Sequence, residues 1–371
     1  MQTMLRIPSA DPKAGYLAHR EEIDAAVRRV LTSGWYILGD ETRAFEAAFA
    51  GYVGVREGVG VASGTDAVHL ALRACGVGPG DEVVTVSHTA TATVAAVDLC
   101  GATPVLVDID PTSYTMIAQH LAAALTPRTR AVVPVHLYGH PADMTAILAV
   151  TNGHGICVVE DCAQAHGAAW AGRKVGGWGT FGAFSFYPTK NLGALGDGGM
   201  VATDDADLGA KARMLREYGW KQRYVSEFPG MNSRLDELQA AILGVKLRYL
   251  DQENDARRGL ARVYEEGLSG LDLALPSEAP GARHVFHQFV VRAPHRDRLR
   301  DFLAARGVGT SVLYPTPNHL QPGYAGCRIG PEGLAETERA SAEILCLPVY
   351  PELSVDHAER VVAVIRAFEG R

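Results

Sequence analysis

The sequence lacks the features that would place it in a specialised class of protein. Its 371 residues include only six cysteines, and no two of them form a C-x-x-C pair. We therefore expect reduced thiols in a cytoplasmic protein rather than a disulfide framework. No apolar run approaches the roughly 20 residues that a membrane-spanning helix needs, and no apolar leader opens the chain. We expect no association with membranes.

An excess of basic charge is also missing. The chain has 35 Lys and Arg against 42 Asp and Glu, so its formal net charge is 35 − 42 = −7. A general nucleic-acid binder is therefore not expected, although a local basic pocket for a phosphorylated ligand remains compatible with mild acidity. The composition is otherwise ordinary, with 47% hydrophobic and 21% charged residues. The length suits two domains, or one large domain with a smaller appendage.

Short apolar strands alternate with helices along the first two thirds of the chain. This rhythm predicts an α/β fold with a mostly parallel sheet covered on both faces. Strands are predicted at 59–62, 82–86, 104–107, 131–135, 156–159, 181–187 and 199–202. Helices are predicted at 21–31, 42–49, 67–75, 91–99, 142–150, 206–218 and 235–268, the last interrupted near 251.

The composition changes near residue 271. A stretch rich in Pro, Gly and Ala, at 271–283, reads as a linker, and residues 1–20 read as irregular. Beyond the linker the pattern predicts a compact α+β domain. We expect a strand at 285–291, helices at 296–305, 332–345 and 355–368, and a Pro-rich loop at 315–322. The predicted division is an N-terminal segment packing with the small domain, a large domain and a small domain, at 1–34, 35–250 and 251–371.

The first candidate site is the segment Ser63-Gly64-Thr65-Asp66, between a predicted strand and a predicted helix. Free N–H groups and the positive end of the helix dipole make such a place a phosphate site. Gly64 allows close approach of the backbone, and the Ser63 and Thr65 hydroxyls can donate hydrogen bonds. A plain helix N-cap by Ser63 or Thr65 is the alternative.

A second candidate is Asp161, which ends a predicted buried strand. Ligands of open α/β sheets bind at the carboxyl ends of strands. An aspartate there can hold a proton on a ring nitrogen, as pyridoxal chemistry requires. The alternatives are a helix N-cap, or a metal site formed with His166, for which the spacing identifies no further ligand.

The third candidate is Lys190, in the segment SFYPTKNLG at 185–193. A lysine held in a buried place has a shifted pKa and becomes a candidate for Schiff-base chemistry. An ordinary surface lysine is the alternative. Together, a phosphate cradle, a strand-end aspartate and a Ser-x-x-x-x-Lys segment are the three parts that pyridoxal 5′-phosphate needs.

Two other motif matches are better explained by turns. The G-x-G-x-x-G at 177–182 precedes a strand, whereas the dinucleotide fingerprint must follow a strand and open a helix. A nicotinamide-dependent oxidoreductase, which the α/β rhythm would also suit, is therefore disfavoured. The D-x-D at 108–110 resembles that of metal-using glycosyltransferases, but its place before Pro111 favours a structural turn.

At this point the sequence resembles a known family, the DegT/DnrJ/EryC1/StrS pyridoxal-phosphate sugar aminotransferases. The resemblance covers nearly the whole chain. It is carried in order by ASGTDA at 62–67, EDCAQAHG at 160–167, SFYPTKNLG at 185–193, GMNSRLDELQAA at 230–241, YP at 314–315 with HLQP at 319–322, and LPVYPEL at 347–353. It implies the fold-type I, aspartate-aminotransferase-like architecture, and a homodimer with sites between the subunits.

The resemblance also implies roles. Lys190 would hold the cofactor as a Schiff base and then move the proton between cofactor and substrate. Asp161 would pair with the pyridine nitrogen, and Gln164 would contact the ring or its 3-hydroxyl. The cofactor alternates between pyridoxal and pyridoxamine phosphate. Its phosphate would be bound by Gly64, Thr65 and Ser185, and by Asn232 of the neighbouring subunit.

Two positions bear on this reading. Many family members stack an aromatic residue on the ring at the position of Ala90, and we hypothesise that His88 supplies that surface here. A strand-end histidine bound to backbone is the alternative. Some relatives carry histidine where Lys190 stands and remove a hydroxyl instead of adding an amine. The lysine therefore favours the transaminase.

The substrate is predicted to be a nucleotide-linked keto-sugar. The region from 215 to 238 looks most like enzymes that aminate C3 of a dTDP-3-keto-6-deoxyhexose, with L-glutamate as donor and 2-oxoglutarate as product. Amination at C4, or of an inosose, stays open, as does a non-catalytic regulator that binds the cofactor. The candidate substrate contacts are Lys221, Arg223, Tyr224, Tyr314 and His319.

Overall fold

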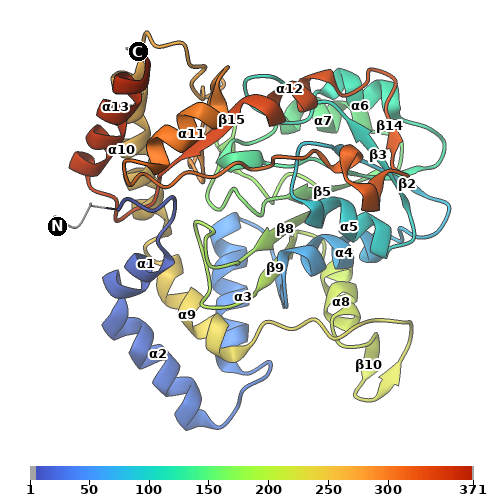
Figure 1. Ribbon diagram of the computed structural model, residues 1–371. Coiled ribbons are helices and arrows are strands. Elements are labelled where there is room, and N and C mark those ends of the chain that lie inside the picture. The colour runs from blue at the N-terminus through green and yellow to red at the C-terminus, as the bar shows by residue number, and fades with distance from the viewer. Residues whose placement is uncertain (1–5, 370–371) are drawn as a thin grey trace.

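The computed structural model describes residues 6–369 and is built around one large sheet flanked by helices (Figure 1). The sheet has eight strands in the order β1-β9-β8-β5-β4-β2-β3-β14. In chain order they are β1 (Glu57–Val61), β2 (Glu82–Val86), β3 (Thr103–Val107), β4 (Thr129–Val133), β5 (Cys157–Asp161), β8 (Phe181–Ser185), β9 (Gly199–Thr203) and β14 (Arg328–Ile329).

Most neighbours in this sheet run parallel, as the α/β rhythm predicts. The parallel pairs are β14–β3, β3–β2, β2–β4, β4–β5 and β5–β8, whereas β9 runs antiparallel to both β8 and β1. Since β5 and β8 are adjacent and parallel, with Asp161 opposite Ala183, their carboxyl ends meet at one edge. This edge is where ligands of open α/β sheets bind.

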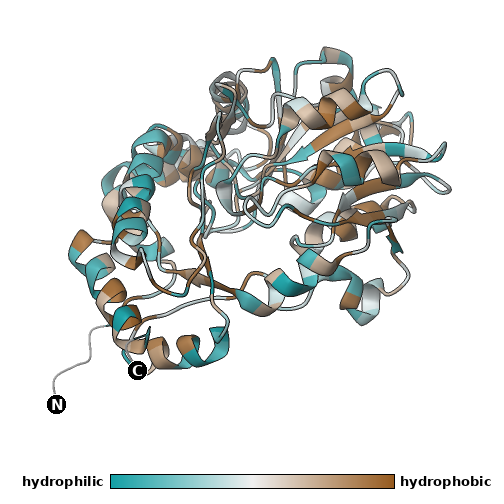
Figure 2. Ribbon diagram, turned by 90° about the horizontal axis from the view of Figure 1, so that it is seen from above, coloured by the Kyte–Doolittle hydropathy of each residue, from teal (hydrophilic) through white to brown (hydrophobic). Residues whose placement is uncertain are grey.

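Both faces of the sheet are buried. Successive residues of one strand belong to different apolar clusters, as with Val83 and Val84, or Val158 and Val159. This is the two-residue period of a strand, and it explains why these segments are continuously apolar. Figure 2 shows apolar strands inside and more hydrophilic helices around them. The α-helices described before residue 250 are α1 (Pro12–Ala18), α2 (Arg20–Ser33), α3 (Asp40–Val53), α4 (Gly64–Ala74), α5 (Thr91–Leu99), α6 (Ala118–Ala124), α7 (Met144–Thr151), α8 (Ala206–Leu215) and α9 (Glu237–Leu247).

The C-terminal part has its own apolar cluster, centred on Tyr264 and Phe289. The C-terminal part is built from α10 (Leu250–Leu268), β13 (Phe289–Arg292), α11 (Arg296–Ala304), α12 (Ala335–Glu343), β15 (Ile344–Leu347) and α13 (Val355–Glu369). It is less separate than a linker would suggest, because β14 joins the large sheet beside β3. In addition, β12 (Ala282–Arg283) pairs with β6 (Ala169–Trp170), which pairs with β7 (Arg173–Lys174).

The N-terminal segment touches both parts of the molecule. Ile7 packs in the C-terminal cluster, beside Val308. Helix α2 instead packs on α9, with Ile23, Ala26 and Val30 facing Ala241, Ile242 and Val245. The domain boundaries therefore stay a prediction. None of the described helices is both long and apolar enough to cross a membrane.

Several predicted elements were wrong in detail. Residues 12–18 form α1 (Pro12–Ala18), begun by the Asp11 side chain, where irregular structure was expected. The predicted helix at 332–345 stops at Glu343, because the apolar run 344–347 pairs as β15 with β13. The long helix breaks at 248–249 rather than near 251. A short apolar run does not reveal by its period whether it forms a buried strand or a helix end.

Candidate active site

Two predicted phosphate-binding pieces are in contact at the edge of the sheet. Helix α4 begins at Gly64, and β8 ends at Ser185. A Cβ atom added to Gly64 would lie 2.5 Å from the Cβ of Ser185 and 3.0 Å from its hydroxyl oxygen. Only glycine therefore lets the helix start come this close to Ser185. Backbone N–H groups at the helix start and the Ser185 hydroxyl are thus brought together, which suits a phosphate.

Ser63 also caps helix α4. Its hydroxyl accepts a hydrogen bond from the N–H of Asp66 at 3.1 Å, and its carbonyl accepts from Ala67. The N-cap alternative is therefore realised for Ser63. The N–H groups of Gly64 and Thr65 precede the first helical hydrogen bond, and they stand at the positive end of the helix dipole. A direct contact of Ser63 or Thr65 with a cofactor stays a prediction.

Asp161 is the last residue of β5 and is buried, with 6% of its surface exposed. One carboxylate oxygen accepts from the Thr93 hydroxyl at 2.8 Å, and the other from the N–H of Ala163 at 3.1 Å. These bonds hold the carboxylate in a fixed orientation at the sheet edge. Thr93 was not singled out from the sequence, although its segment was, because nothing in the spacing tells which hydroxyl faces β5.

Lys190 lies in the loop after β8 and is partly buried. Burial lowers the pKa of Lys190 to about 8, against the opposing effect of Asp161, which favours the charged amine. Lys190 and Asp161 therefore lie close enough to interact, although they are 29 positions apart in the sequence. The depressed pKa gives the amine a larger neutral fraction near neutral pH than an ordinary surface lysine has. The Schiff-base role of Lys190 stays a prediction.

Gln164 connects the predicted cofactor and substrate residues. Its amide oxygen accepts from the N–H of Tyr138 at 2.7 Å, and its amide nitrogen donates to the Tyr314 hydroxyl at 3.1 Å. Burial raises the pKa of the Tyr314 phenol, and the charge of the Asp161 carboxylate raises it further. Tyr314 therefore lies near Asp161. His319 bonds Ser87 at 2.8 Å and Glu338 at 3.2 Å. Substrate contacts of Tyr314 and His319 stay predictions.

His88 is completely buried, and both its ring nitrogens are bonded to side chains. Nε2 lies 2.8 Å from the Tyr138 hydroxyl, and Nδ1 lies 3.3 Å from that of Ser341. Burial lowers the pKa of His88 to about 4, with a smaller contribution from Arg292. The alternative of a backbone-bound histidine is therefore not what the structure shows. Stacking on the ring of a cofactor stays a prediction.

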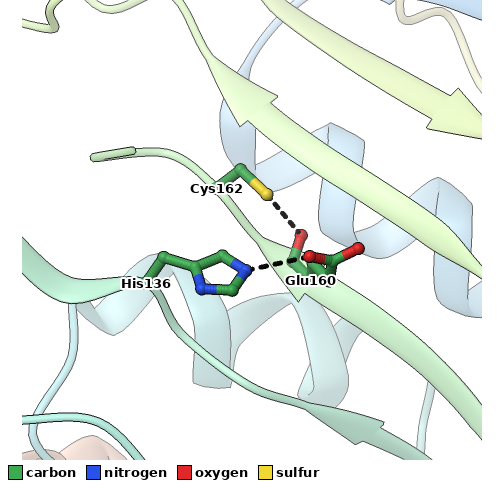
Figure 3. A group of neighbouring side chains, drawn as sticks. All are labelled: His136, Glu160 and Cys162. Atoms are coloured by element: carbon green, nitrogen blue, oxygen red, sulfur yellow. Dashed lines mark hydrogen bonds and ion pairs between the residues drawn. The ribbon is translucent and has the colours of Figure 1, made fainter. Parts of the chain in front are cut away.

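The residue before Asp161 anchors the same strand end. Glu160, fully buried, lies beside His136 and Cys162, as Figure 3 shows. Its two carboxylate oxygens accept from the N–H groups of 176, 178 and 179 at 2.7–2.8 Å and from His136 Nε2 at 3.1 Å. Cys162 donates to the Glu160 carbonyl at 3.6 Å.

This trio has the composition of a metal site, but its ligand atoms are already bonded. Each Glu160 oxygen accepts two hydrogen bonds, and Nδ1 of His136 accepts from the N–H of Ala142 at 2.9 Å. A buried carboxylate with four donors is a satisfied charge. Glu160 therefore ties the glycine-rich turn at 176–179 to the strand that carries Asp161. The predicted turn is confirmed for 177–180, and β8 begins at Phe181.

The remaining predicted residues are exposed. Asn232 is exposed and pairs with Glu217 through the backbone. The hairpin formed by β10 (Trp220–Gln222) and β11 (Val225–Ser226) projects from the molecule next to α8 (Figure 1). On it, Lys221 pairs with Glu227 at 3.1 Å, and Arg223 lies over the ring of Tyr224. Tyr224 is 73% exposed.

The buried residues fit pyridoxal 5′-phosphate by their chemistry. The group needs an amine for its aldehyde, a carboxylate for its ring nitrogen and donors for its phosphate. Lys190 and Asp161 interact here. The start of helix α4 comes close to Ser185, an approach that a Cβ atom at Gly64 would obstruct. The structure thus brings together residues that the sequence separates by more than a hundred positions.

Comparison with known proteins agrees with this geometry. Residues 18–366 match the model of the DegT/DnrJ/EryC1/StrS aminotransferase family. A dTDP-3-amino-3,4,6-trideoxy-alpha-D-glucose transaminase of Streptomyces venezuelae is 50% identical over 99% of this chain and 97% of its own. The erythromycin biosynthesis sensory transduction protein EryC1 of Saccharopolyspora erythraea is 49% identical over 97% of this chain and 99% of its own.

A solved structure is similar over the same length. The crystal structure of DesV from S. venezuelae in complex with a ketimine intermediate superposes with a TM-score of 0.96 at 49% identity. The match covers 99% of each chain. The fold-type I architecture expected from the sequence is confirmed.

Proposed function

The chain belongs to the DegT/DnrJ/EryC1/StrS aminotransferase family and is a pyridoxal-phosphate-dependent aminotransferase; we propose that it transfers an amino group from L-glutamate to C3 of a dTDP-linked 3-keto-6-deoxyhexose. The observation that carries this proposal is Lys190, with its lowered pKa, interacting with the buried Asp161 at the edge of the sheet. The 50% identical transaminase is named for a 3-amino dTDP-sugar, which supports C3 as the position.

When bound, the cofactor supplies an aldehyde that exchanges amines and a ring that withdraws electrons from the reacting carbon. The chain's own residues supply the rest. Asp161 is oriented by Thr93 and Ala163, so that it can hold a proton on the ring nitrogen. The helix start at Gly64 and the Ser185 hydroxyl would hold the phosphate. Gln164 would orient the ring from the side of Tyr314.

Lys190 is assigned the proton transfers. A general base works best when its pKa lies near the operating pH. Burial brings the pKa of Lys190 to about 8, so a useful fraction of the amine is neutral near neutral pH. The amine would take the proton from the donor amino acid and return it to the acceptor sugar.

Sugar recognition is assigned to the β10–β11 hairpin. A nucleotide-sugar presents a diphosphate and a flat base, which suit basic and aromatic side chains. Lys221, Arg223 and Tyr224 offer these groups on a solvent-exposed turn. Tyr314 and His319 would contact the sugar nearer to Lys190. Amination at C4, or of an inosose, would use the same chemistry with different pocket contacts.

A homodimer is part of the proposal. Asn232 and the hairpin project to solvent, and the consecutive residues Trp35, Tyr36 and Ile37 are 64%, 50% and 39% exposed. Exposed apolar runs are typical of association surfaces. A mixture of the Lys190→Ala and Asn232→Ala chains tests a shared site. Half of the random dimers are mixed and hold one intact site each, so activity should recover to about a quarter of the wild-type level. No recovery would place Asn232 outside the partner's site.

The other candidate function is a cofactor-binding regulator. The name of the 49% identical sensory transduction protein favours it. Turnover separates the two functions, because a regulator would bind the cofactor without releasing product.

The test incubates the cofactor-loaded protein with L-glutamate and a panel of nucleotide-linked keto-sugars, differing in the nucleotide and in the position of the ketone. The proposal predicts 2-oxoglutarate and a 3-amino dTDP-sugar, identified by mass and by NMR of the amine-bearing carbon. A 4-amino product would correct the position. Absence of any amino sugar from the whole panel would overturn the proposal.

A further inference from the structure

The residue that follows Lys190 is bonded on three sides inside the protein. Asn191 is 3% exposed. Its amide nitrogen donates to Oδ1 of Asn254 at 2.8 Å and to the carbonyl of Val285 at 3.2 Å. Its amide oxygen lies 2.9 Å from Nδ1 of His287. All three partners come from residues beyond 250, whereas Asn191 belongs to the loop after β8.

The bonding pattern leaves one consistent set of hydrogen positions. Since both N–H donors of Asn191 are used by carbonyl oxygens, its own oxygen must accept, so Nδ1 of His287 carries a hydrogen. The other ring nitrogen of His287 then accepts from the Gln288 amide at 3.4 Å, and the ring is neutral. Burial, with Lys190 next in effect, lowers the pKa of His287 well below its ordinary value and keeps it neutral.

The same network reaches the loop that carries Asp161. The amide nitrogen of Asn254 donates to the carbonyl of His166 at 2.9 Å. A Cβ at Gly167 would lie 2.7 Å from that nitrogen, so the glycine permits the approach. One continuous chain of bonds thus runs from His287 through Asn191 and Asn254 to the end of the 161–167 loop.

We propose that Asn191 is a positioning residue that fixes the Lys190 amine relative to Asp161, by tying the loop of Lys190 to the loop of Asp161 through Asn254. The inference rests on the role of Lys190 in the proposed function. Asn191 touches neither substrate nor cofactor in this assignment and acts only through the loop it holds. The bonds are buried, so solvent does not compete for them.

The loop has other anchors, and they show what Asn191 adds. Lys246 donates to the carbonyl of Gly193 at 2.5 Å, and the N–H of Ala194 bonds the carbonyl of Phe186 at 2.8 Å. These contacts hold the end of the loop at 193–194. Asn191 is next to Lys190 itself and carries the link to the loop of Asp161.

The test uses the cofactor-free protein and pyridoxal phosphate as the probe. Lys190 attacks the aldehyde carbon, a C=N bond forms, and the aldehyde oxygen leaves as water. The rate depends on the neutral amine, so its pH dependence reports the pKa of Lys190 in each variant. Groups that can influence this titration lie on several elements: Asp161, His166, Lys246, Glu253, Arg257, His287 and Glu352.

Four variants separate the possible effects. Asn191→Ala removes the bonds, and Asn254→Ala cuts the link to the 161–167 loop without touching the residue next to Lys190. Tyr264→Phe removes one buried hydrogen bond of the C-terminal part, from its hydroxyl to the carbonyl of Pro348 at 2.8 Å, and is the matched control. Asn191→Asp keeps the shape but places an acceptor against two carbonyl oxygens.

We expect condensation at pH 8 to slow about tenfold or more in Asn191→Ala and in Asn254→Ala. A tenfold change corresponds to the loss of one well-made buried hydrogen bond. Its pH midpoint should move upward as the amine becomes better solvated. In Tyr264→Phe the midpoint should stay at the wild-type value, even if the melting temperature falls. Asn191→Asp should not restore the wild-type rate.

The outcomes are distinguishable. If Asn191→Ala does not fold, Asn254→Ala decides. If both variants condense with the wild-type rate and midpoint, Asn191 does not position the lysine. A midpoint shift of equal size in Tyr264→Phe would show a general structural effect and also overturn the inference. If the wild-type protein itself fails to condense, the proposed function fails instead.

Discussion

The loops that carry Asp161 and Lys190 and the exposed β10–β11 hairpin differ in how many contacts within the chain hold them in place. Near the active-site pair, the Asp161 carboxylate and the Asn191 amide are bonded to protein, and the carbonyl of Gly193 accepts from Lys246. On the hairpin, Tyr224 is 73% exposed, and Lys221 has an ion pair whose members are both largely in solvent. The first region is held in place by contacts within one chain, whereas we expect the second to become ordered on contact with substrate or a neighbouring subunit.

This difference separates chemistry from specificity. Amine exchange needs a few groups in a fixed geometry, and such groups must be held by packing and hydrogen bonds. Recognition of one nucleotide-sugar among many can be left to surface residues that order on binding. Substitutions in the two regions should therefore have different effects on activity.

The largest effect is expected for Lys190→Ala. The variant should fold, bind pyridoxal phosphate only reversibly and lose about 10⁴-fold in kcat, the upper range for a positioned acid–base group. Transamination rates and the absorbance of the bound cofactor measure this. Lys174→Ala, which removes a lysine from beside Tyr52, is the matched control and should stay active. A Lys190→Ala protein with near-normal turnover would remove the lysine from the mechanism.

Asp161→Asn comes next. The amide is close in shape and can keep the Thr93 bond, but it cannot hold a proton on the ring nitrogen as a charge. We expect about a 10²–10³-fold loss of kcat, in the range found for one electrostatic contact to the transition state. Thr93→Val should also lower kcat, but by less, because it removes only the hydrogen bond that orients the Asp161 carboxylate. Equal losses in both variants would make orientation, not charge, the function of Asp161.

A smaller effect, confined to the sugar, is expected on the hairpin. Tyr224→Ala and Arg223→Ala should raise KM for the nucleotide-sugar about tenfold, the effect of one lost stacking or charge contact. The half-reaction with L-glutamate and the melting temperature should not change. Glu227→Ala breaks the ion pair with Lys221 without removing a candidate contact and should be close to wild type. A fall in the glutamate half-reaction would show that the hairpin shapes the buried site.

A further expectation concerns the stability of the cofactor-free protein rather than its activity. The pKa of Lys190 is about 8 when folded and 10.5 in a free lysine, so the unfolded chain binds more protons between these values. Stability of the cofactor-free protein should therefore rise with pH from about 8 to 10.5, and the burial penalty is complete below pH 8. Lys190→Met should be more stable than wild type by roughly 2–3 kcal/mol at pH 7, with the advantage fading above pH 8. Urea unfolding at several pH values across this range measures the stability difference between the variant and the wild type. A difference that does not change with pH would contradict the expectation.

Much of this could be predicted from the sequence. The α/β rhythm predicted the parallel sheet, because strands buried on both faces are continuously apolar. Family motifs located Lys190 and Asp161, and the structure places them in one site. The partners that orient them were beyond reach. Thr93 and Asn254 are ordinary polar residues on helices, and only the packing of those helices decides that they face Asp161 and the loop of Lys190.

The ends of elements were also hard to predict. The strand β15 continues directly from helix α12, and its apolar run 344–347 carries no period that distinguishes strand from helix. Pairing with β13, more than fifty residues earlier, decides its state. Local preference gives way to tertiary context at such places.

The central claim is that Lys190 and Asp161 form a pyridoxal-phosphate transamination site, and the most direct measurement is the absorbance spectrum of the purified, cofactor-loaded protein during addition of L-glutamate. The account predicts that the visible band of the lysine-bound cofactor is replaced by the pyridoxamine band, with one 2-oxoglutarate released per site. It also predicts that Lys190→Ala shows no lysine-bound band. A protein that binds no chromophore, or whose spectrum does not respond to any amino donor, would contradict the account.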